Sequence, residues 1–184
     1  LDIPIQHIND GILRKMNRRG TGAEIRALFQ TLRQRIPGLV LRTSLIAGLP
    51  GEGEAEFEEL CAFLKEAKIE RVGVFPFSPE EGTPAAVMDH VDAEEARRRA
   101  DLILQLQQPI MDKFLRGFVG KELRVLYEYD DEESGLHVGR SYADSPDIDG
   151  LVLFTGAAEE GDMIDVRIDS VEDGLLYGHR EAEA

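Results

Sequence analysis

The sequence contains a single cysteine, Cys61, and this scarcity excludes several classes of protein. One thiol cannot build a disulfide framework, so a cytoplasmic origin is favoured. One thiolate also cannot hold an iron–sulfur cluster or a zinc site that needs three or four cysteines. No apolar run approaches the roughly 18 residues of a transmembrane helix, so we expect no membrane-spanning segment.

Basic residues are scarce in the last third of the chain. Residues 118–184 hold five basic and 18 acidic residues, a net charge of −13, whereas the whole chain of 184 residues carries −15. Because phosphate backbones are bound through Lys and Arg, this segment is poorly suited to nucleic acid. Its charge favours a basic protein partner, although an acidic surface kept only for solubility explains it equally well.

The first 117 residues alternate apolar and amphipathic segments. Apolar strands are expected at residues 1–5, 39–47 and 71–77, each followed by helical spacing of apolar residues. This order is typical of parallel strands joined by right-handed crossovers. Three such units cannot close a barrel, so we expect part of a TIM-like (β/α) barrel. Since the chain begins at Leu1 within an apolar run, we expect it to be a piece of a longer protein.

Helix boundaries are marked by particular residues. Thr21 with Glu24, and Asp92 with Glu95, have the spacing of capping boxes at helix N-termini. Pro109 is expected to kink or split the helix that runs to about residue 114. The helix after Thr21 should bury an apolar stripe made of Ile25, Leu28, Phe29, Leu32 and Ile36. Cys61 lies on the apolar face of the next helix, and we expect it to be buried and inert.

From residue 118 onward the pattern changes to short strands separated by acidic turns. Five strands are expected, at residues 122–129, 137–142, 151–155, 163–171 and 175–178. This number of strands predicts a small antiparallel five-stranded β-barrel of the OB-like kind. The predicted domains are therefore residues 1–117 and 118–184.

In a βα fold the functional residues lie at the carboxyl ends of the strands. Three groups of residues are predicted to meet there. Glycines allow a ligand to approach the backbone, and an aromatic ring can stack on a flat ligand ring. Ordinary turns, capping and core packing are the competing interpretations of every one of these residues. The groups are Gln6 and His7, then Gly48, Pro50 and Gly51, then Phe75, Phe77 and Ser78.

Arg42 is a separate candidate because it lies inside an apolar strand. A buried arginine needs a carboxylate partner, which belongs either to the protein or to a small ligand. The sequence shows no catalytic triad and no metal-ligand cluster, so the catalytic residues stay unknown and no metal site is expected.

Four segments, taken in order, carry a family resemblance. They are LDIPIQH at 1–7, ILRKMNRRG at 12–20, LRTSLIAGLPGE at 41–52 and RVGVFPFSPEEGTPA at 71–85. Together they resemble the later part of the radical S-adenosylmethionine (SAM) methylthiotransferases. The resemblance implies half of a radical SAM barrel followed by the β domain called TRAM.

Two branches of that family compete: a MiaB-like branch that modifies tRNA adenosine, and a RimO-like branch that modifies an aspartate of a small-subunit ribosomal protein. His7 after Gln6, and the segment GRSYADSPDIDGLVLF at 139–154, resemble the RimO-like branch. The acidic β domain agrees, because ribosomal proteins are basic. Asp144 and Asp147 are then expected to face that partner, and direct binding of nucleic acid is not expected.

The resemblance also implies cofactors. Contacts with SAM would come from Gln6, His7, Arg42, Gly48, Pro50, Gly51, Phe75, Phe77 and Ser78. The intact protein would hold two [4Fe–4S] clusters and methylthiolate the β-carbon of the aspartate. The family's C-x3-C-x2-C motif is absent, so this chain ligates neither cluster and should be inactive alone. Gly53 replaces the family's usual threonine cap. A non-catalytic acidic module that binds basic proteins is the third alternative.

Overall fold

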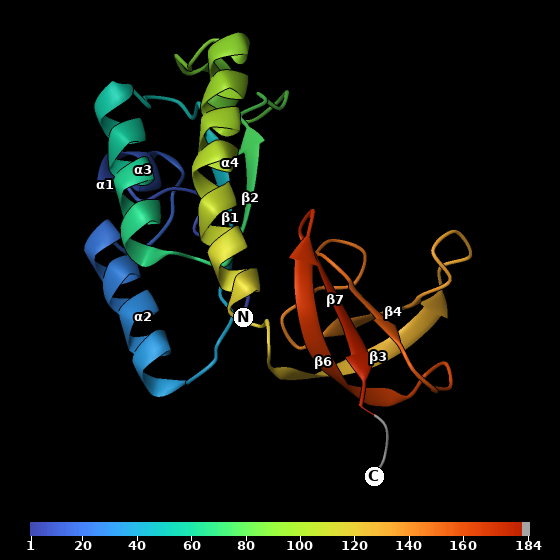
Figure 1. Ribbon diagram of the computed structural model, residues 1–184. Helices are drawn as coiled ribbons and strands as arrows, with labels where there is room; N and C mark the ends of the chain where they lie inside the picture. Colours follow the sequence, from blue (N-terminus) through green and yellow to red (C-terminus); the bar gives the residue numbers. More distant parts are fainter. Residues whose placement is uncertain (182–184) are drawn as a thin grey trace. The chain divides into compact units, whose positions relative to one another are not determined.

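A computed structural model describes residues 1–181 of the chain (Figure 1). The chain forms two compact units, Leu1–Ile110 and Met111–Ala184. The division between them falls inside helix α4 (Ala93–Arg116), one residue beyond Pro109. The domain boundary predicted at residues 117 and 118 lies just beyond the end of this helix and stays a prediction.

The first unit is an α/β region with two parallel strands. Strand β1 (Arg42–Ala47) pairs with β2 (Arg71–Pro76) in a continuous register that runs from Arg42 opposite Arg71 to Ala47 opposite Pro76. The parallel pairing confirms the predicted βα order. In chain order the elements are α1 (Asp10–Lys15), α2 (Gly22–Arg35), β1 (Arg42–Ala47), α3 (Glu54–Ala67), β2 (Arg71–Pro76), the 3-10 turn η1 (Pro84–Val87) and α4.

The strand predicted at residues 1–5 is present only as an interrupted one. Two isolated parallel bridges, Asp2 to Arg42 and Gln6 to Leu45, join this segment to β1. Between them Pro4 has no amide hydrogen to donate. The Thr43 hydroxyl fills the gap, because it donates to the Ile3 carbonyl at 2.8 Å and accepts from the Ile5 amide at 3.2 Å. The backbone ladder is therefore replaced locally by one buried side chain.

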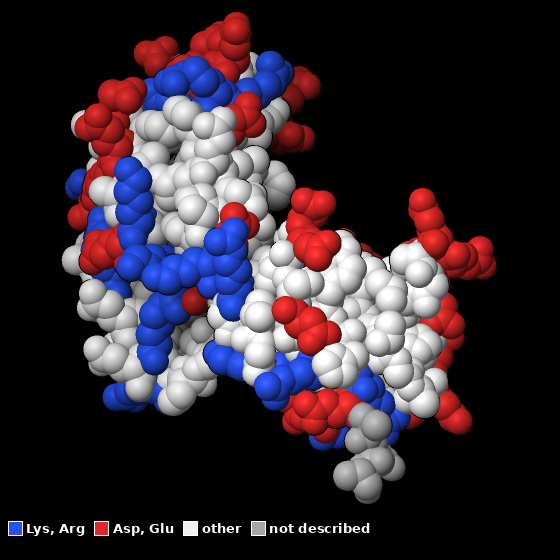
Figure 2. Space-filling view, in the orientation of Figure 1, with Lys and Arg blue, Asp and Glu red and all other residues white. Residues whose placement is uncertain are grey.

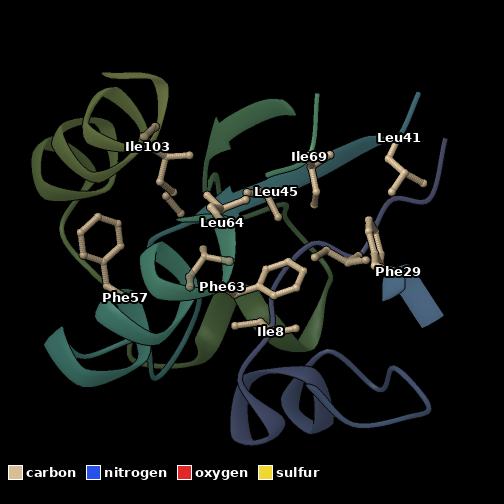
Figure 3. Close-up of a cluster of buried hydrophobic side chains, with 13 residues drawn as sticks. Ile8, Phe29, Leu41, Leu45, Phe57, Phe63, Leu64, Ile69 and Ile103 are labelled. Atoms are coloured by element: carbon tan, nitrogen blue, oxygen red, sulfur yellow. The ribbon is translucent and has the colours of Figure 1, made fainter. Parts of the chain in front are cut away.

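Helices cover one face of this sheet and close a core over it (Figures 1 and 3). Of the predicted stripe of α2, only Phe29 is buried, while Leu28 and Ile36 are exposed, so the stripe is narrower than expected. Cys61 is only partly buried, which corrects the expectation of full burial. The labelled core residues are Ile8, Phe29, Leu41, Leu45, Phe57, Phe63, Leu64, Ile69 and Ile103.

The helix ends agree in part with the capping predictions. Thr21 and Glu24 form the expected reciprocal capping box of α2. Asp92 accepts from the Glu94 amide, but Glu95 turns to Arg98 and Arg99 and so forms no capping box. Gly53 starts α3 without a side-chain cap, and its amide donates to Glu56 at 3.0 Å instead. Pro109 lies inside α4, which continues through it to Arg116.

The second unit contains a closed five-stranded barrel. The strands are β3 (Glu122–Asp130), β4 (His137–Ser141), β5 (Val152–Thr155), β6 (Met163–Glu172) and β7 (Leu175–Arg180), in the order β3-β4-β5-β7-β6. All five coincide closely with the predicted segments. The β5–β7 pair is parallel, so the barrel is mixed and the expectation of a purely antiparallel barrel is wrong in this pair. Alternate side chains, such as Leu123, Val125 and Tyr127, point into its core.

Among residues 1–181, no helix combines the length and the apolar character needed to cross a membrane.

Candidate functional site

The ends of the first segment, β1 and β2 meet at one edge of the sheet. The Gln6 amide donates to the Ser44 carbonyl, and the Gln6 carbonyl accepts from the Ile46 amide, both at 2.9 Å. The Phe77 amide continues this edge by donating to the Ala47 carbonyl at 2.7 Å. Gln6 adopts a left-handed conformation with φ of 68°, which is uncommon for a residue with a side chain. Backbone strain of this kind occurs most often at functional sites.

The turn that follows β1, residues 48–51, requires its two glycines. Gly48 and Gly51 both have φ of 84°, a conformation that favours glycine. A Cβ added at Gly48 would overlap the Ala96 side chain of α4, and one at Gly51 would overlap the ammonium group of Lys15. Gly48 and Pro50 are buried, whereas Gly51 is exposed. The Gly48 end of the turn is thus packed tightly against α4, whereas the Gly51 end is exposed beside the flexible Lys15 side chain.

The buried carboxylate of Glu52 binds the backbone of this turn. Glu52 is only 3% exposed, and its two carboxylate oxygens accept from the Gly48 amide at 2.9 and 3.0 Å. Arg99 of α4 donates to the same carboxylate at 2.9 Å and to the Glu52 carbonyl at 3.0 Å. Arg99 also donates to Glu95 at 2.9 Å, and its guanidinium lies 5.1 Å from the Phe57 ring centre. We call Glu52 and Arg99 the buried clamp.

His7 lies beside the buried clamp with no exposed surface. Its Nδ1 accepts from the Asn9 amide at 3.0 Å, which places the proton of a neutral ring on Nε2. Nε2 faces the Glu52 carboxylate at 3.5 Å, too far for a regular hydrogen bond. His7 is therefore a buried side chain that lies beside Glu52 in this structure.

The environment of Glu52 favours its charged form. Burial by itself raises the pKa of Glu52, but interactions with His7, Arg99 and the Gly48 amide outweigh burial and lower the pKa below its ordinary value. The clamp is therefore an ion pair at neutral pH.

The second face of the sheet is open at the same edge. Residues paired in register share a face, so Ser44 and Ile46 of β1 lie beside Gly73 and Phe75 of β2. Phe75 is 60% exposed, and Gly73 leaves space next to its ring. An exposed ring, a hydroxyl and a glycine-rich turn are groups that fit a ligand with a flat ring and polar substituents.

The three other predicted SAM contacts differ from these residues: Arg42 lies at the opposite end of β1, whereas Phe77 and Ser78 directly follow β2. Arg42 begins β1, five residues before Ala47, which is roughly 16 Å away at about 3.3 Å per residue. The Phe77 ring packs on His90 with centres 5.6 Å apart, so it differs from the exposed Phe75. Ser78 is exposed in the loop after β2. Of the predicted set, Gln6, Gly48, Pro50, Gly51, Phe75 and the backbone of Phe77 lie along this edge, with His7 buried beside Glu52.

The two predicted partner-binding residues of the barrel unit have different roles. Asp144 turns toward its own loop, where it accepts from the Ser141 amide at 3.0 Å and the Ser141 hydroxyl at 2.7 Å. Asp147 is exposed in a left-handed conformation with φ of 59°. Its neighbour Ile148 is 72% exposed, so this loop presents a carboxylate beside an apolar side chain.

A denser group of carboxylates lies where two other loops of the barrel meet. The Tyr127 amide donates to the Asp162 carbonyl, and the Tyr127 carbonyl accepts from the Gly161 amide, both at 2.9 Å. These bonds bring the loop before β6 next to the end of β3. Figure 2 shows acidic groups projecting from the visible face of the barrel unit. We call the following residues the acidic loop pair: Asp130, Asp131, Glu132, Glu133, Glu159, Glu160 and Asp162.

A hydrogen-bonded cluster lies next to the acidic loop pair. Asp130 accepts from the Tyr127 hydroxyl at 2.6 Å and pairs with His137 at 2.6 Å. The hydrogen bond to Asp130 raises the pKa of Tyr127 to about 12, and bonds from Tyr127 and His137 lower the pKa of Asp130. The cluster ties the end of β3 to β4.

We expect the barrel unit to lose stability as the pH rises from 10 to about 12. The folded state keeps Tyr127 neutral above its ordinary pKa of 10, so the stabilisation present below pH 10 is lost as pH passes through the folded pKa of about 12. Thermal midpoints measured against pH test this, with Tyr127→Phe removing the loss. Tyr129→Phe is the matched control, and an unchanged loss in Tyr127→Phe contradicts the assignment.

The sequence of this chain is similar to that of known proteins. Residues 119–180 match the TRAM domain model. The chain is 46% identical over 97% of its length to the ribosomal protein uS12 methylthiotransferase RimO of Geobacter sulfurreducens. Proteins of the same name from Geotalea uraniireducens and Thermosynechococcus vestitus are 45% and 41% identical, each over 97% of this chain. The chain is RimO-like over nearly its whole length.

This likeness confirms the resemblance predicted from the sequence and its RimO-like branch. The chain spans about 40% of the length of each of these three relatives. The barrel unit is a TRAM domain, as predicted.

Two residues of the site were missed from the sequence. Glu52 follows directly on the glycine turn, and that position could have marked it as a carboxylate able to cap the turn. Arg99 is one of three consecutive arginines in α4, and nothing in the sequence distinguishes it from Arg97 and Arg98. Only the packing of α4 against the turn selects it.

Proposed function

We propose that the chain is part of a cytoplasmic radical SAM enzyme that adds a methylthio group to the β-carbon of an aspartate in ribosomal protein uS12. The observation that carries this is identity of 41–46% with three RimO proteins over 97% of the chain. Such similarity covers the sheet edge and the TRAM domain together, so it applies to both units.

The open edge of the first unit is the place where we propose that SAM binds. Phe75 would stack on the adenine ring, and the backbone at Gln6, Gly48 and Gly51 would lie against its polar groups. Bound SAM supplies a radical when an iron–sulfur cluster reduces it. With one cysteine, this chain would leave both [4Fe–4S] clusters to other parts of the protein. The chain's own residues orient the cofactor.

The TRAM domain is the place where we propose that uS12 docks. Residues 118–184 hold five basic and 18 acidic residues, and an acidic surface attracts a basic partner over long range. Exposed Asp147 and the acidic loop pair are the groups best placed to contact it. Phosphate backbones would be repelled by the same charge, so direct tRNA binding is disfavoured.

Titration of the chain with purified uS12 and with a tRNA anticodon stem-loop, at roughly 150 mM salt, tests this proposal. We expect saturable binding of uS12 alone, weakened at higher salt because the attraction is electrostatic. The double variant Glu132→Lys/Glu133→Lys should weaken it by roughly tenfold, since like charges then face the partner. Glu81→Lys, an exposed change in the first unit, is the control. Binding of the stem-loop alone would favour the tRNA branch instead.

A further inference from the structure

The buried clamp raises the question of what a charged pair does where no ligand can reach it. Glu52 and Arg99 are 3% and 6% exposed, so neither touches a molecule bound at the sheet edge. A buried ion pair is also a poor source of stability, because desolvation offsets most of the attraction. Its value must therefore come from the geometry that it imposes.

Apart from the bond between Arg99 and Glu95 and the bond within the pair, the hydrogen bonds of the clamp end on the turn or on the residues that follow it. Glu52 accepts from the Gly48 amide through both oxygens, which fixes the first peptide of the turn. Arg99 donates to the backbone carbonyls of Glu52 at 3.0 Å and Gly53 at 3.3 Å, which fixes the last peptides. The turn is thus held at both ends by two side chains.

The clamp also connects the turn to α4. Arg99 is itself held by Glu95 one turn earlier in the helix, at 2.9 Å. Between these two residues, Ala96 packs on Gly48 so closely that no side chain fits at that glycine. The first turns of α4 therefore act as a rigid support for residues 48–53. Pro50, one of these supported residues, is buried as well.

We propose that Arg99 and Glu52 are positioning residues for cofactor binding: they hold the backbone of the turn 48–51 in the shape that receives SAM, without touching it. This inference rests on the proposed function for the identity of the ligand. Preorganised backbone raises affinity because little ordering remains to be done on binding. Misplacement of a turn by about 1 Å can reduce activity by a factor on the order of 100, so the effect is measurable.

The test compares Arg99→Gln and Arg99→Lys with wild type in the full-length protein that carries this chain. Arg98→Lys is the matched control, since Arg98 pairs with the same Glu95 but lies exposed on the helix. Two quantities are measured: amide hydrogen exchange of the peptide covering residues 47–53, and the dissociation constant for SAM. In Arg99→Gln we expect faster exchange confined to this peptide and a dissociation constant raised roughly tenfold. Arg99→Lys should restore part of both.

Each other outcome has a definite meaning. Unchanged exchange at residues 47–53 in Arg99→Gln overturns the inference, and so does faster exchange throughout residues 1–110, which indicates a role in folding only. Faster local exchange with unchanged SAM affinity overturns it as well, because the turn's shape would then not matter to the ligand. If wild type binds no SAM while the local exchange still changes, the proposed function fails and the support of the turn by Arg99 stands.

Discussion

Replacing Glu52 by alanine is expected to lower the free energy of unfolding of the first unit by about 3–5 kcal/mol. The substitution leaves the Arg99 guanidinium, which is 6% exposed, without its buried carboxylate partner. It also leaves the Gly48 amide without an acceptor inside the protein. Urea unfolding followed by circular dichroism measures the change, because the free energy falls linearly with denaturant concentration.

A double-mutant cycle separates the interaction energy between Glu52 and Arg99 from the contribution that each residue makes by itself. Because Glu52→Ala and Arg99→Ala each remove the buried partner of the other charge, the double variant should be less destabilised than the sum of the two, by at least about 1 kcal/mol. Glu58→Ala on the exposed side of α3 is the control and should change the free energy by no more than about 0.5 kcal/mol. A loss below about 1 kcal/mol in Glu52→Ala would show that water replaces the carboxylate at this site.

Phe154→Ala is expected to destabilise the barrel unit by about 3–5 kcal/mol. Phe154 of β5 has no exposed surface, and its ring meets those of Tyr127 and His137 at centre distances of 5.7 and 5.3 Å. Removing it leaves a cavity where three strands pack together, and β5 is the shortest strand of the barrel, Val152–Thr155. Urea unfolding of the barrel unit measures the loss.

The same variant tests whether the two units fold separately. If they do, amide exchange in residues 1–110 stays as in wild type while exchange in residues 119–180 becomes faster. Tyr129→Ala is the control, since Tyr129 is exposed on β3 and its loss should cost less than about 1 kcal/mol. Faster exchange in both units of Phe154→Ala would instead make the chain one cooperative unit.

Several predictions from local, periodic patterns agree with the structure, although the Asp92–Glu95 capping box did not form. The five barrel strands follow from alternating apolar residues between acidic turns, and the α2 start follows from Thr21 and Glu24. The first strand is another exception, because Pro4 lacks an amide hydrogen and only the distant Thr43 hydroxyl bridges the gap. Residues 1–5 by themselves give no indication of that contact with Thr43.

The candidate site likewise contains a part that could be predicted from the sequence and a part that could not. Its edge was predictable, since strand ends meet where parallel strands share a direction, and Gln6, Gly48, Pro50 and Gly51 lie there. Arg42 was grouped with them by the family resemblance, but its position at the start of β1 puts it at the other end of the strand. The parallel pairing of β5 with β7 was likewise hidden, because it arises only when the closed barrel makes β7, and not β6, the neighbour of β5.

By itself, the sequence determined the family resemblance, the order of the elements and the strongly acidic barrel unit, because these are carried by residue types and spacings along the chain. The tertiary structure alone decided that Arg99, rather than Arg97 or Arg98, reaches Glu52, and that His7 lies enclosed beside them. The physical reason is that a buried charge needs a partner at hydrogen-bond distance, and residues 47 positions apart become neighbours only when α4 packs onto the turn.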